Sequence, residues 1–192
     1  CEFHYVHHDR DGRAYADDAT LSQCLLRAAA RAGVRRVVYV SSVAAVGHNG
    51  QPLDEQHWND EQENAYYRSK ILAERAAWEM ARALDLSMVV VLPSAMIGPN
   101  AARLTDSMGF IESIRRRRVP LDPGFRFNFV DVRDVAEGMI LAAERGRSGQ
   151  RYILANERSS SLAQIIEAAN AVVPGYRLPP PAPRWRWPRP AD

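Results

Sequence analysis

The chain has 192 residues, 46% of them hydrophobic, and its 25 basic and 23 acidic residues leave a formal net charge of +2. This length and apolar content suffice for one folded domain and exclude a disordered chain, and no apolar stretch reaches the ~18 residues needed to span a bilayer. The balanced charge gives no basis for a nucleic-acid or membrane partner. No signal peptide is visible and two cysteines form no disulfide framework, so we expect a cytoplasmic protein.

The first 17 residues carry a group of potential metal ligands. Cys1, His4, His7 and His8 lie here, and thiolate and imidazole are good ligands for zinc. No second cluster elsewhere in the sequence supplies the remaining ligands, so we expect no metal site. We interpret residues 1–17 as a divergent or disordered terminus.

Hydrophobic periodicity predicts strands that alternate with helices along the rest of the chain. The predicted strands lie near residues 36–41, 87–92, 126–130 and 151–155, and the predicted helices near 20–32, 65–84, 131–145 and 161–172. This alternation is typical of an α/β fold with a mainly parallel sheet. Ser161 and Gln164 have the spacing of a capping box at the start of the last helix, and Asp131 or Asp134 is expected to cap the helix before it.

Two serines follow the first predicted strand. Residues 34–42 form a continuous apolar run that ends in Ser41 and Ser42, which is typical of a strand buried on both faces. Ligands of open parallel sheets bind just beyond the carboxyl ends of the strands, so the Ser42 hydroxyl is placed to hold a substrate oxygen. We expect Ser41 to point to the other face. The alternative for Ser42 is an ordinary helix-cap or loop residue.

Lys70 is the only lysine in the chain, and it lies four residues after Tyr66 in the predicted helix 65–84. Residues at i and i+4 share a helix face, whereas Tyr67 lies around the helix and is expected to pack. An ammonium near a phenol favours the phenolate, which lets a tyrosine act as an acid or base nearer neutral pH, and a guanidinium does not replace that compact charge. Glu74 falls among the polar positions of the same amphipathic helix. The alternative is a chance pairing of the two residue types.

The sequence around these residues resembles one enzyme family. Ser42, Tyr66 and Lys70, in the settings VVYVSSVAAVG and YYRSKILAE, resemble the extended short-chain dehydrogenase/reductase family of the NAD-dependent epimerase/dehydratase type. Further stretches agree with it, namely residues 25–33, 88–99, 127–136 and 149–155. The resemblance extends over residues 18–170 and is nearest to the dihydroflavonol-reductase-like and hopanoid-associated sugar-epimerase branch.

The resemblance implies a Rossmann-like domain, partial over residues 18–177, that binds NAD or NADP and a small-molecule substrate. It implies that Tyr66 donates or accepts the proton, that Lys70 binds the nicotinamide ribose and tunes Tyr66, and that Ser42 orients the substrate oxygen. The resemblance also assigns a cofactor loop, whose backbone meets the nicotinamide carboxamide, to Pro93, Ser94, Ala95 and Met96. The alternative for that loop is an ordinary strand exit broken by proline.

The glycine-rich turn that opens the family's fold is missing from the sequence. Family members begin with a βαβ unit in which backbone amides at a helix N-terminus take the pyrophosphate. The eleven glycines here are scattered and form no such motif, and the first residue is Cys1 rather than methionine. We therefore expect a truncated chain that lacks roughly 70 to 90 residues of the family's N-terminal part. The residue that distinguishes NAD from NADP belongs to that part.

The residues after the serine narrow the reaction that the resemblance implies. Sugar dehydratases of the family carry an acidic pair after the catalytic hydroxyl, whereas Val43 and Ala44 follow Ser42. Epimerisation of a sugar or reduction of a ketone or aldehyde remains, and a homodimer is possible within the family. The alternative is a catalytically inactive fragment or a noncatalytic interaction module.

Two basic segments admit an anion-binding and a structural interpretation. Residues 115–118 are four consecutive arginines, which could bind a diphosphate or simply end a solvated helix. Residues 178–192 carry six prolines with Arg184, Trp185, Arg186 and Trp187 interleaved. We expect these residues to form a frayed, extended tail after a small C-terminal substrate-binding part, and we expect no nucleic acid to bind it.

Overall fold

A computed structural model describes residues 13–47, 51–101 and 104–183. The chain divides into two compact units, each formed from two stretches of sequence. Unit 1 comprises residues 1–92 and 138–153, and unit 2 comprises residues 93–137 and 154–192. Cys1, His4, His7 and His8 of the discounted metal cluster, and residues 184–192 of the tail, lie outside the described residues.

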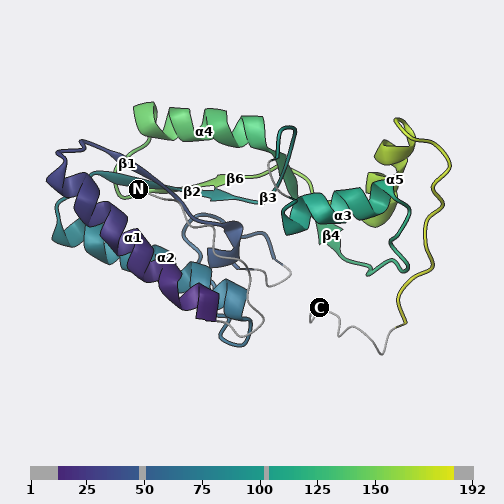
Figure 1. Ribbon diagram of the computed structural model, residues 1–192, viewed down its shortest axis with the longest axis horizontal. Coiled ribbons are helices and arrows are strands. Elements are labelled where there is room, and N and C mark those ends of the chain that lie inside the picture. Colours follow the sequence, from purple (N-terminus) through teal and green to yellow (C-terminus); the bar gives the residue numbers. More distant parts are fainter. Residues whose placement is uncertain (1–12, 48–50, 102–103, 184–192) are drawn as a thin grey trace. The chain divides into compact units, whose positions relative to one another are not determined.

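A three-stranded sheet forms the centre of unit 1 (Figure 1). Its order is β1 (Val37–Val40), β2 (Met88–Pro93) and β6 (Arg151–Leu154). β1 and β2 run parallel and pair residue by residue from Val37 with Met88 to Val40 with Val91. Every residue of β2 is buried, as expected of a strand that is covered on both faces.

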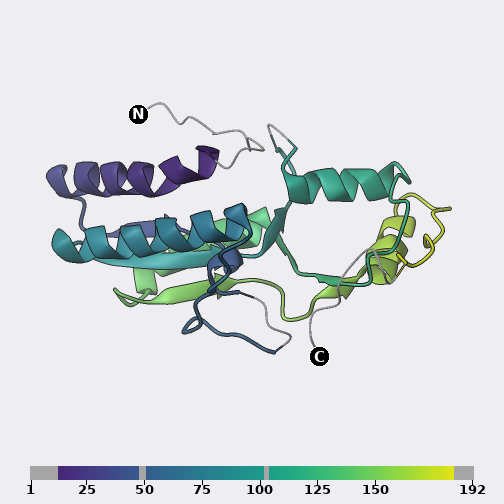
Figure 2. The same ribbon diagram turned by 90° about the horizontal axis from the view of Figure 1, so that it is seen from below.

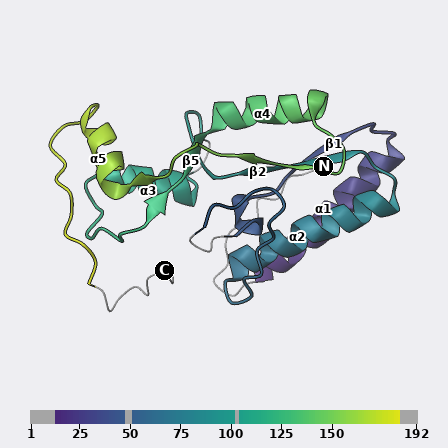
Figure 3. The same cartoon turned by 180° about the vertical axis from the view of Figure 1, so that it is seen from behind.

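Helices cover both faces of this sheet. The helices α1 (Arg13–Arg31) and α2 (Ala65–Ala83) lie side by side against one face, and the part of α4 (Val132–Arg145) that belongs to unit 1 covers the other (Figures 2 and 3). The side chain of Arg36 donates to the carbonyl of Ala143 at 2.7 Å and so ties the start of β1 to α4. The buried core comprises Leu26, Ala45, Val46, Ala77, Ala81, Met88, Val90 and Leu92.

Unit 2 contains two small sheets and two helices. β3 (Ala95–Ile97) pairs in parallel with β5 (Phe129–Asp131), and β4 (Arg126–Phe127) pairs antiparallel with β7 (Ser160–Ser161). The helices are α3 (Asp106–Arg115) and α5 (Leu162–Asn170). Ile114, Leu162 and Ile166 form the buried core, and Phe110 stacks on Phe127 with ring centroids 4.5 Å apart.

The α/β fold with parallel strand pairs is confirmed, and the predicted strands and helices are found within a few residues of their expected bounds, except for α1 and the strand near 126–130. The capping box of Ser161 and Gln164 is present, and Asp131 accepts from the Arg133 amide at 2.8 Å at the start of α4. The expectation of one strand over 126–130 is wrong. Asn128 interrupts it because its side chain exchanges hydrogen bonds with Asn156, and the flanking strands enter two different sheets of unit 2.

The structure favours the helix-end interpretation of the four arginines. Arg115 and Arg116 both bind the Glu112 carboxylate at 2.6 Å, and Arg117 donates to the carbonyl of Pro174. The described part of the tail is not frayed, because the Asp122 amide donates to Pro180 and the Asp122 carbonyl accepts from the Ala182 amide. Within the described ranges, no helix is long and apolar enough to cross a membrane.

Candidate functional site

Ser42 lies two residues beyond the carboxyl end of β1 and begins a short 3₁₀ helix, η1 (Val43–Ala45). Its backbone is extended, and its hydroxyl oxygen accepts from the Ala44 amide at 3.1 Å. The cap uses one lone pair of the oxygen, and a serine hydroxyl also has one hydrogen to donate. Ser42 is therefore a cap residue whose O–H group can still orient a ligand oxygen.

Tyr66 and Lys70 lie in the first two turns of α2. The Asn64 side chain caps this helix by accepting from the amides of Tyr66 and Tyr67 at 3.0 and 3.2 Å. The Lys70 ammonium lies over the Tyr66 ring, 5.7 Å from its centroid, as the spacing of four residues predicts. Tyr67 packs beside it, with ring centroids 5.9 Å apart. The cation and the phenol are thus held on one face of one helix.

The serine turn and the helix pack against each other within unit 1. Ala44 and Ala45 of η1 are buried, as is Ala73 of α2, and small side chains let two backbones approach closely. A pocket of about 200 Å³ between α1, β1 and α2 is lined by Leu21, Ser22, Leu25, Tyr39, Val40, Ser41, Lys70 and Ala73. The strand pattern places Ser41 on the face of the strand opposite to Ser42. Ser41 and Lys70 thus line the same pocket.

The segment Pro93–Met96 is not one continuous loop. Pro93 ends β2, Ala95 and Met96 begin β3, and Ser94 alone lies outside the strands. The chain changes sheets at this point, because the Ser94 amide donates to Leu154 and the next amide donates to Asn128. All four residues belong to unit 2.

Ser94 carries a buried hydroxyl group that has no hydrogen-bond partner among the described residues. A buried polar atom of this kind is rare in a folded protein and is commonly satisfied by water or a ligand. The Ser94 hydroxyl therefore fits a polar group of a bound molecule.

Sequence reasoning missed a buried ion pair behind the site. The Arg151 guanidinium donates to the Glu74 carboxylate at 2.7 Å, and the two side chains are 6% and 0% exposed. Placing Glu74 among the polar surface positions of the helix is therefore wrong. The signal that could have indicated the burial of Glu74 is its position along the helix. Glu74 lies one turn beyond Lys70 and three residues after Ile71, which is buried.

A larger pocket, of about 500 Å³, lies elsewhere in unit 1 and contains none of the predicted site residues. Trp58, Trp78, Met88 and Arg151 are among its lining residues. No group of three potential metal-ligating side chains occurs in the parts of the chain that the structure describes. Ser42, Tyr66 and Lys70 lie instead on the turn after β1 and on α2, which pack against each other.

Comparisons with known proteins agree on one family. Residues 4–155 match the sequence model of the NAD dependent epimerase/dehydratase family. A Synechocystis sp. protein named "Putative dihydroflavonol 4-reductase" is 36% identical over 185 residues, which cover 92% of this chain and 53% of the relative. Cinnamoyl-CoA reductase 2 of Arabidopsis thaliana is 34% identical, over 81% of this chain and 50% of its own length. The chain therefore spans about half the length of the curated relatives it matches.

Solved structures share the fold. The crystal structure of gox2253 superposes with a TM-score of 0.85 at 28% identity, over 98% of this chain and 58% of that protein. The UDP-glucose 4-epimerase of Thermus thermophilus, in complex with NAD, has a TM-score of 0.67 at 21% identity, over 86% of this chain and 58% of its own. The second likeness is one of fold alone.

Proposed function

Because the chain belongs to the NAD dependent epimerase/dehydratase family, we propose that it carries the catalytic part of an NAD(P)-dependent oxidoreductase or epimerase. The reaction takes place at a hydroxyl or carbonyl carbon of a small molecule, such as a sugar, a ketone or an aldehyde. One observation carries the proposal. The Lys70 ammonium lies 5.7 Å from the Tyr66 ring centroid on the helix that packs against the Ser42 turn.

Each of the three residues has a distinct role in this proposal. The Tyr66 phenol exchanges a proton with the substrate oxygen, and the Ser42 hydroxyl donates to the same oxygen and orients it. The Lys70 ammonium, which lies over the Tyr66 ring, binds a ribose hydroxyl group of the dinucleotide. The bound dinucleotide supplies or accepts the hydride.

The segment Pro93–Met96 is the proposed contact for the nicotinamide end of the dinucleotide. The buried Ser94 hydroxyl supports this assignment, because a carboxamide group offers both a donor and an acceptor to it. Val43 and Ala44 support reduction or epimerisation over dehydration, since neither side chain provides an acid or a base.

A noncatalytic interaction module is the second candidate. We also propose a cytoplasmic homodimer. Exposed leucines on the outer helices, namely Leu21 and Leu25 of α1 and Leu72 of α2, support self-association, which sedimentation velocity measures directly.

A coenzyme titration tests the first candidate against the second. The purified chain is titrated with NADH and with NADPH, and nicotinamide fluorescence is followed in the wild type, Tyr66→Phe, Lys70→Ala and the matched control Tyr67→Phe. We expect saturable binding that Lys70→Ala weakens about tenfold, since one hydrogen bond to a charged group is lost, and that Tyr67→Phe leaves unchanged. Binding that is absent from the wild type would favour the interaction module.

A further inference from the structure

The Glu74 carboxylate accepts four hydrogen bonds from three separate parts of unit 1. Its Oε1 atom accepts from Arg151 Nε at 2.7 Å and from the Trp78 indole at 3.2 Å. Its Oε2 atom accepts from the Ser41 hydroxyl at 2.6 Å and from an Arg151 terminal nitrogen at 3.3 Å. The carboxylate of α2 is therefore tied to the end of β1 and to β6, which are 33 and 77 residues away in sequence.

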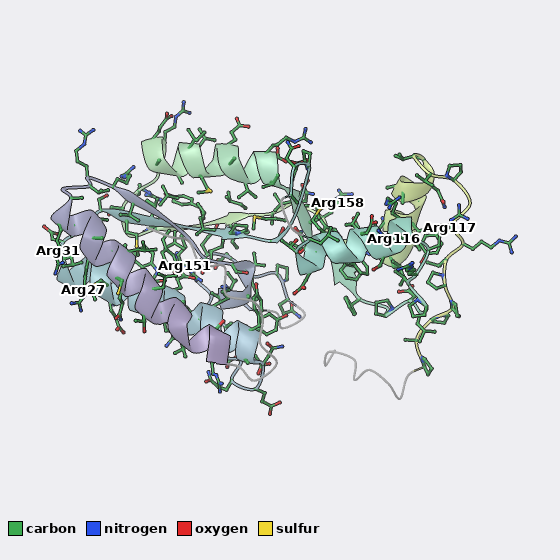
Figure 4. The ribbon with its side chains drawn as sticks, viewed as in Figure 1. Arg27, Arg31, Arg116, Arg117, Arg151 and Arg158 are labelled. Atoms are coloured by element: carbon green, nitrogen blue, oxygen red, sulfur yellow. The ribbon has the colours of Figure 1, made fainter. Side chains whose placement is uncertain are left out.

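Arg151 extends the same network to the segment between η1 and α2. One terminal nitrogen donates to the carbonyls of Glu55 and His57 at 3.0 and 2.6 Å. The guanidinium also lies over the Trp58 ring, 4.0 Å from its centroid. Figure 4 labels Arg151 within unit 1, and it labels Arg27 and Arg31, two exposed residues of α1, near one end of that helix.

Stability alone does not account for this arrangement. Moving two charges out of water is unfavourable, and well-packed apolar residues of similar volume commonly stabilise a core at least as well. The charges add a fixed geometry. When all donors and acceptors of a carboxylate and a guanidinium are satisfied, the two groups, and the elements that carry them, are held in one relative orientation.

From these contacts we infer that the Glu74–Arg151 pair is a positioning device, which rests on the function proposed above. It holds the serine-bearing end of β1 and the helix that carries Tyr66 and Lys70 in one fixed relation. Glu74 and Ser41 are therefore positioning residues that act through their neighbours.

The sequence positions of the two residues explain how the pair reaches the site. Ser41 directly precedes Ser42, and successive side chains of an extended segment point to opposite sides, so fixing Ser41 fixes the direction of Ser42. Glu74 lies one helical turn beyond Lys70, on the same face of α2. A single carboxylate thus joins the serine-bearing end of β1 to the helix that carries Lys70, and Ser41 and Lys70 line one pocket.

A second anchor holds the serine turn on its other side. The buried Asn59 side chain donates to the Ala44 carbonyl at 2.8 Å, and the Asn59 backbone amide donates to the Ala45 carbonyl at 3.0 Å. Asn59 follows directly on the segment that Arg151 binds. The chain that leads from η1 toward α2 is thereby fixed at both η1 and β6.

Ser41 offers a variant pair that isolates the hydrogen bond. Threonine and valine have nearly the same shape and both suit a strand, but threonine alone keeps the hydroxyl that Glu74 binds. Ser41→Thr and Ser41→Val therefore differ in one donor. Ser87→Ala is the control, because the Ser87 hydroxyl accepts from Arg36 at the opposite end of the sheet.

Hydrogen exchange measured by mass spectrometry reads the position of the serine turn directly. For Ser41→Val we expect about tenfold faster exchange of the amides of residues 44–47, with the amides of β2 unchanged, and for Ser41→Thr and Ser87→Ala the wild-type pattern. A uniform increase over both segments, or equal behaviour of Ser41→Thr and Ser41→Val, would overturn the inference.

An NADH titration of the same variants, when fully folded, measures their coenzyme affinity. A purely structural role of the Ser41 hydrogen bond would leave that affinity unchanged. We expect about tenfold weaker binding for Ser41→Val and wild-type affinity for Ser41→Thr. Equal affinities of these two variants would also overturn the inference. If the wild type binds no NADH, the proposed function fails, while the exchange experiment still decides whether the pair positions the serine turn.

Discussion

The two units place their ion pairs of carboxylates with arginines in opposite environments. In unit 1, Glu74 and Arg151 are buried and satisfy one another at the centre of the packing between sheet and helix. In unit 2, the described ion pairs of Glu112 and Asp131 with arginines lie at the surface, around an apolar and aromatic core. A carboxylate and an arginine therefore fix the orientation of packed elements in unit 1, whereas in unit 2 such pairs lie in water at the surface.

The difference shows what burial does to an ion pair. An exposed pair is screened by water and contributes little to stability, whereas a buried pair is directional and strongly coupled to its neighbours. Among the described residues, the buried polar side chains of unit 1 are Asn59, Ser69, Glu74 and Arg151, and Ser94 is the one in unit 2. We therefore expect substitutions of charged groups to affect unit 1 far more than unit 2.

The largest expected effect is that of Glu74→Gln. It leaves the Arg151 guanidinium buried without a counter-charge, so the free energy of unfolding should fall by about 3–5 kcal/mol. Urea unfolding followed by tryptophan fluorescence measures this, in a Trp185→Phe/Trp187→Phe background in which Trp58 and Trp78 report on unit 1.

Replacing both partners is the matched control for that variant. Glu74→Met combined with Arg151→Met should recover most of the lost stability, because no buried charge remains unpaired. If the Glu74→Gln variant is as stable as the wild type, the buried ion pair of unit 1 matters no more to stability than the surface pairs of unit 2, and the comparison is contradicted.

Leu162→Ala tests the apolar side of the comparison. Leu162 is fully buried in the core of unit 2, and its truncation should lower the free energy of unfolding by about 3 kcal/mol through lost burial and a residual cavity. Far-UV circular dichroism follows the whole chain, and the fluorescence of Trp58 and Trp78 follows unit 1. If the variant moves both transitions equally, the two units unfold as one and their stabilities are not separable.

Ser161→Ala should have a smaller effect, of about 1 kcal/mol, because it removes the capping box at the start of α5. The Ser161 oxygen accepts from the Gln164 amide at 3.3 Å, and the Gln164 side chain accepts from the Ser161 amide at 2.9 Å. Urea unfolding by circular dichroism measures the change. Gln164→Ala removes the bonds that the Gln164 side chain accepts from Ser161 and from the exposed Arg126, but it keeps the cap made by the Ser161 oxygen, and it should cost less. The reverse order of the two variants would contradict the assigned cap.

The smallest effect is expected at Glu112. Its hydrogen bonds to Arg115 and Arg116 lower the pKa of the carboxyl group to about 2 from an ordinary value of 4.5. The small stability that this solvent-screened pair contributes is present above pH 4.5 and is lost as the pH falls through the lowered pKa, and a carboxyl ¹³C titration should show a midpoint below 4.5. Since the pair is exposed, Glu112→Gln should leave the urea midpoint at pH 7 unchanged within error. A shift as large as that of Glu74→Gln would contradict the comparison.

Much of the fold was predictable because its signals are local. The apolar run of β2, the i, i+4 spacing of Tyr66 and Lys70 and the capping box of Ser161 each depend on a few neighbouring residues. The break at Asn128 was not predictable, because its partner Asn156 is 28 residues away. The strand structure of Pro93–Met96 was not predictable for the same reason, since the backbone hydrogen-bond partners of Ser94 and Ala95 come from other parts of the chain.

The sequence by itself determined the family, the α/β class and the three residue types that the proposed chemistry needs, because motif and periodicity are properties of the chain alone. Only the tertiary structure decided the environment of those residues. It buried Glu74, brought Arg151 to it across 77 residues and turned the Ser41 hydroxyl toward the helix. Whether a charged residue is solvated or locked in a core depends on what packs around it, and that is settled by contacts between segments far apart in sequence.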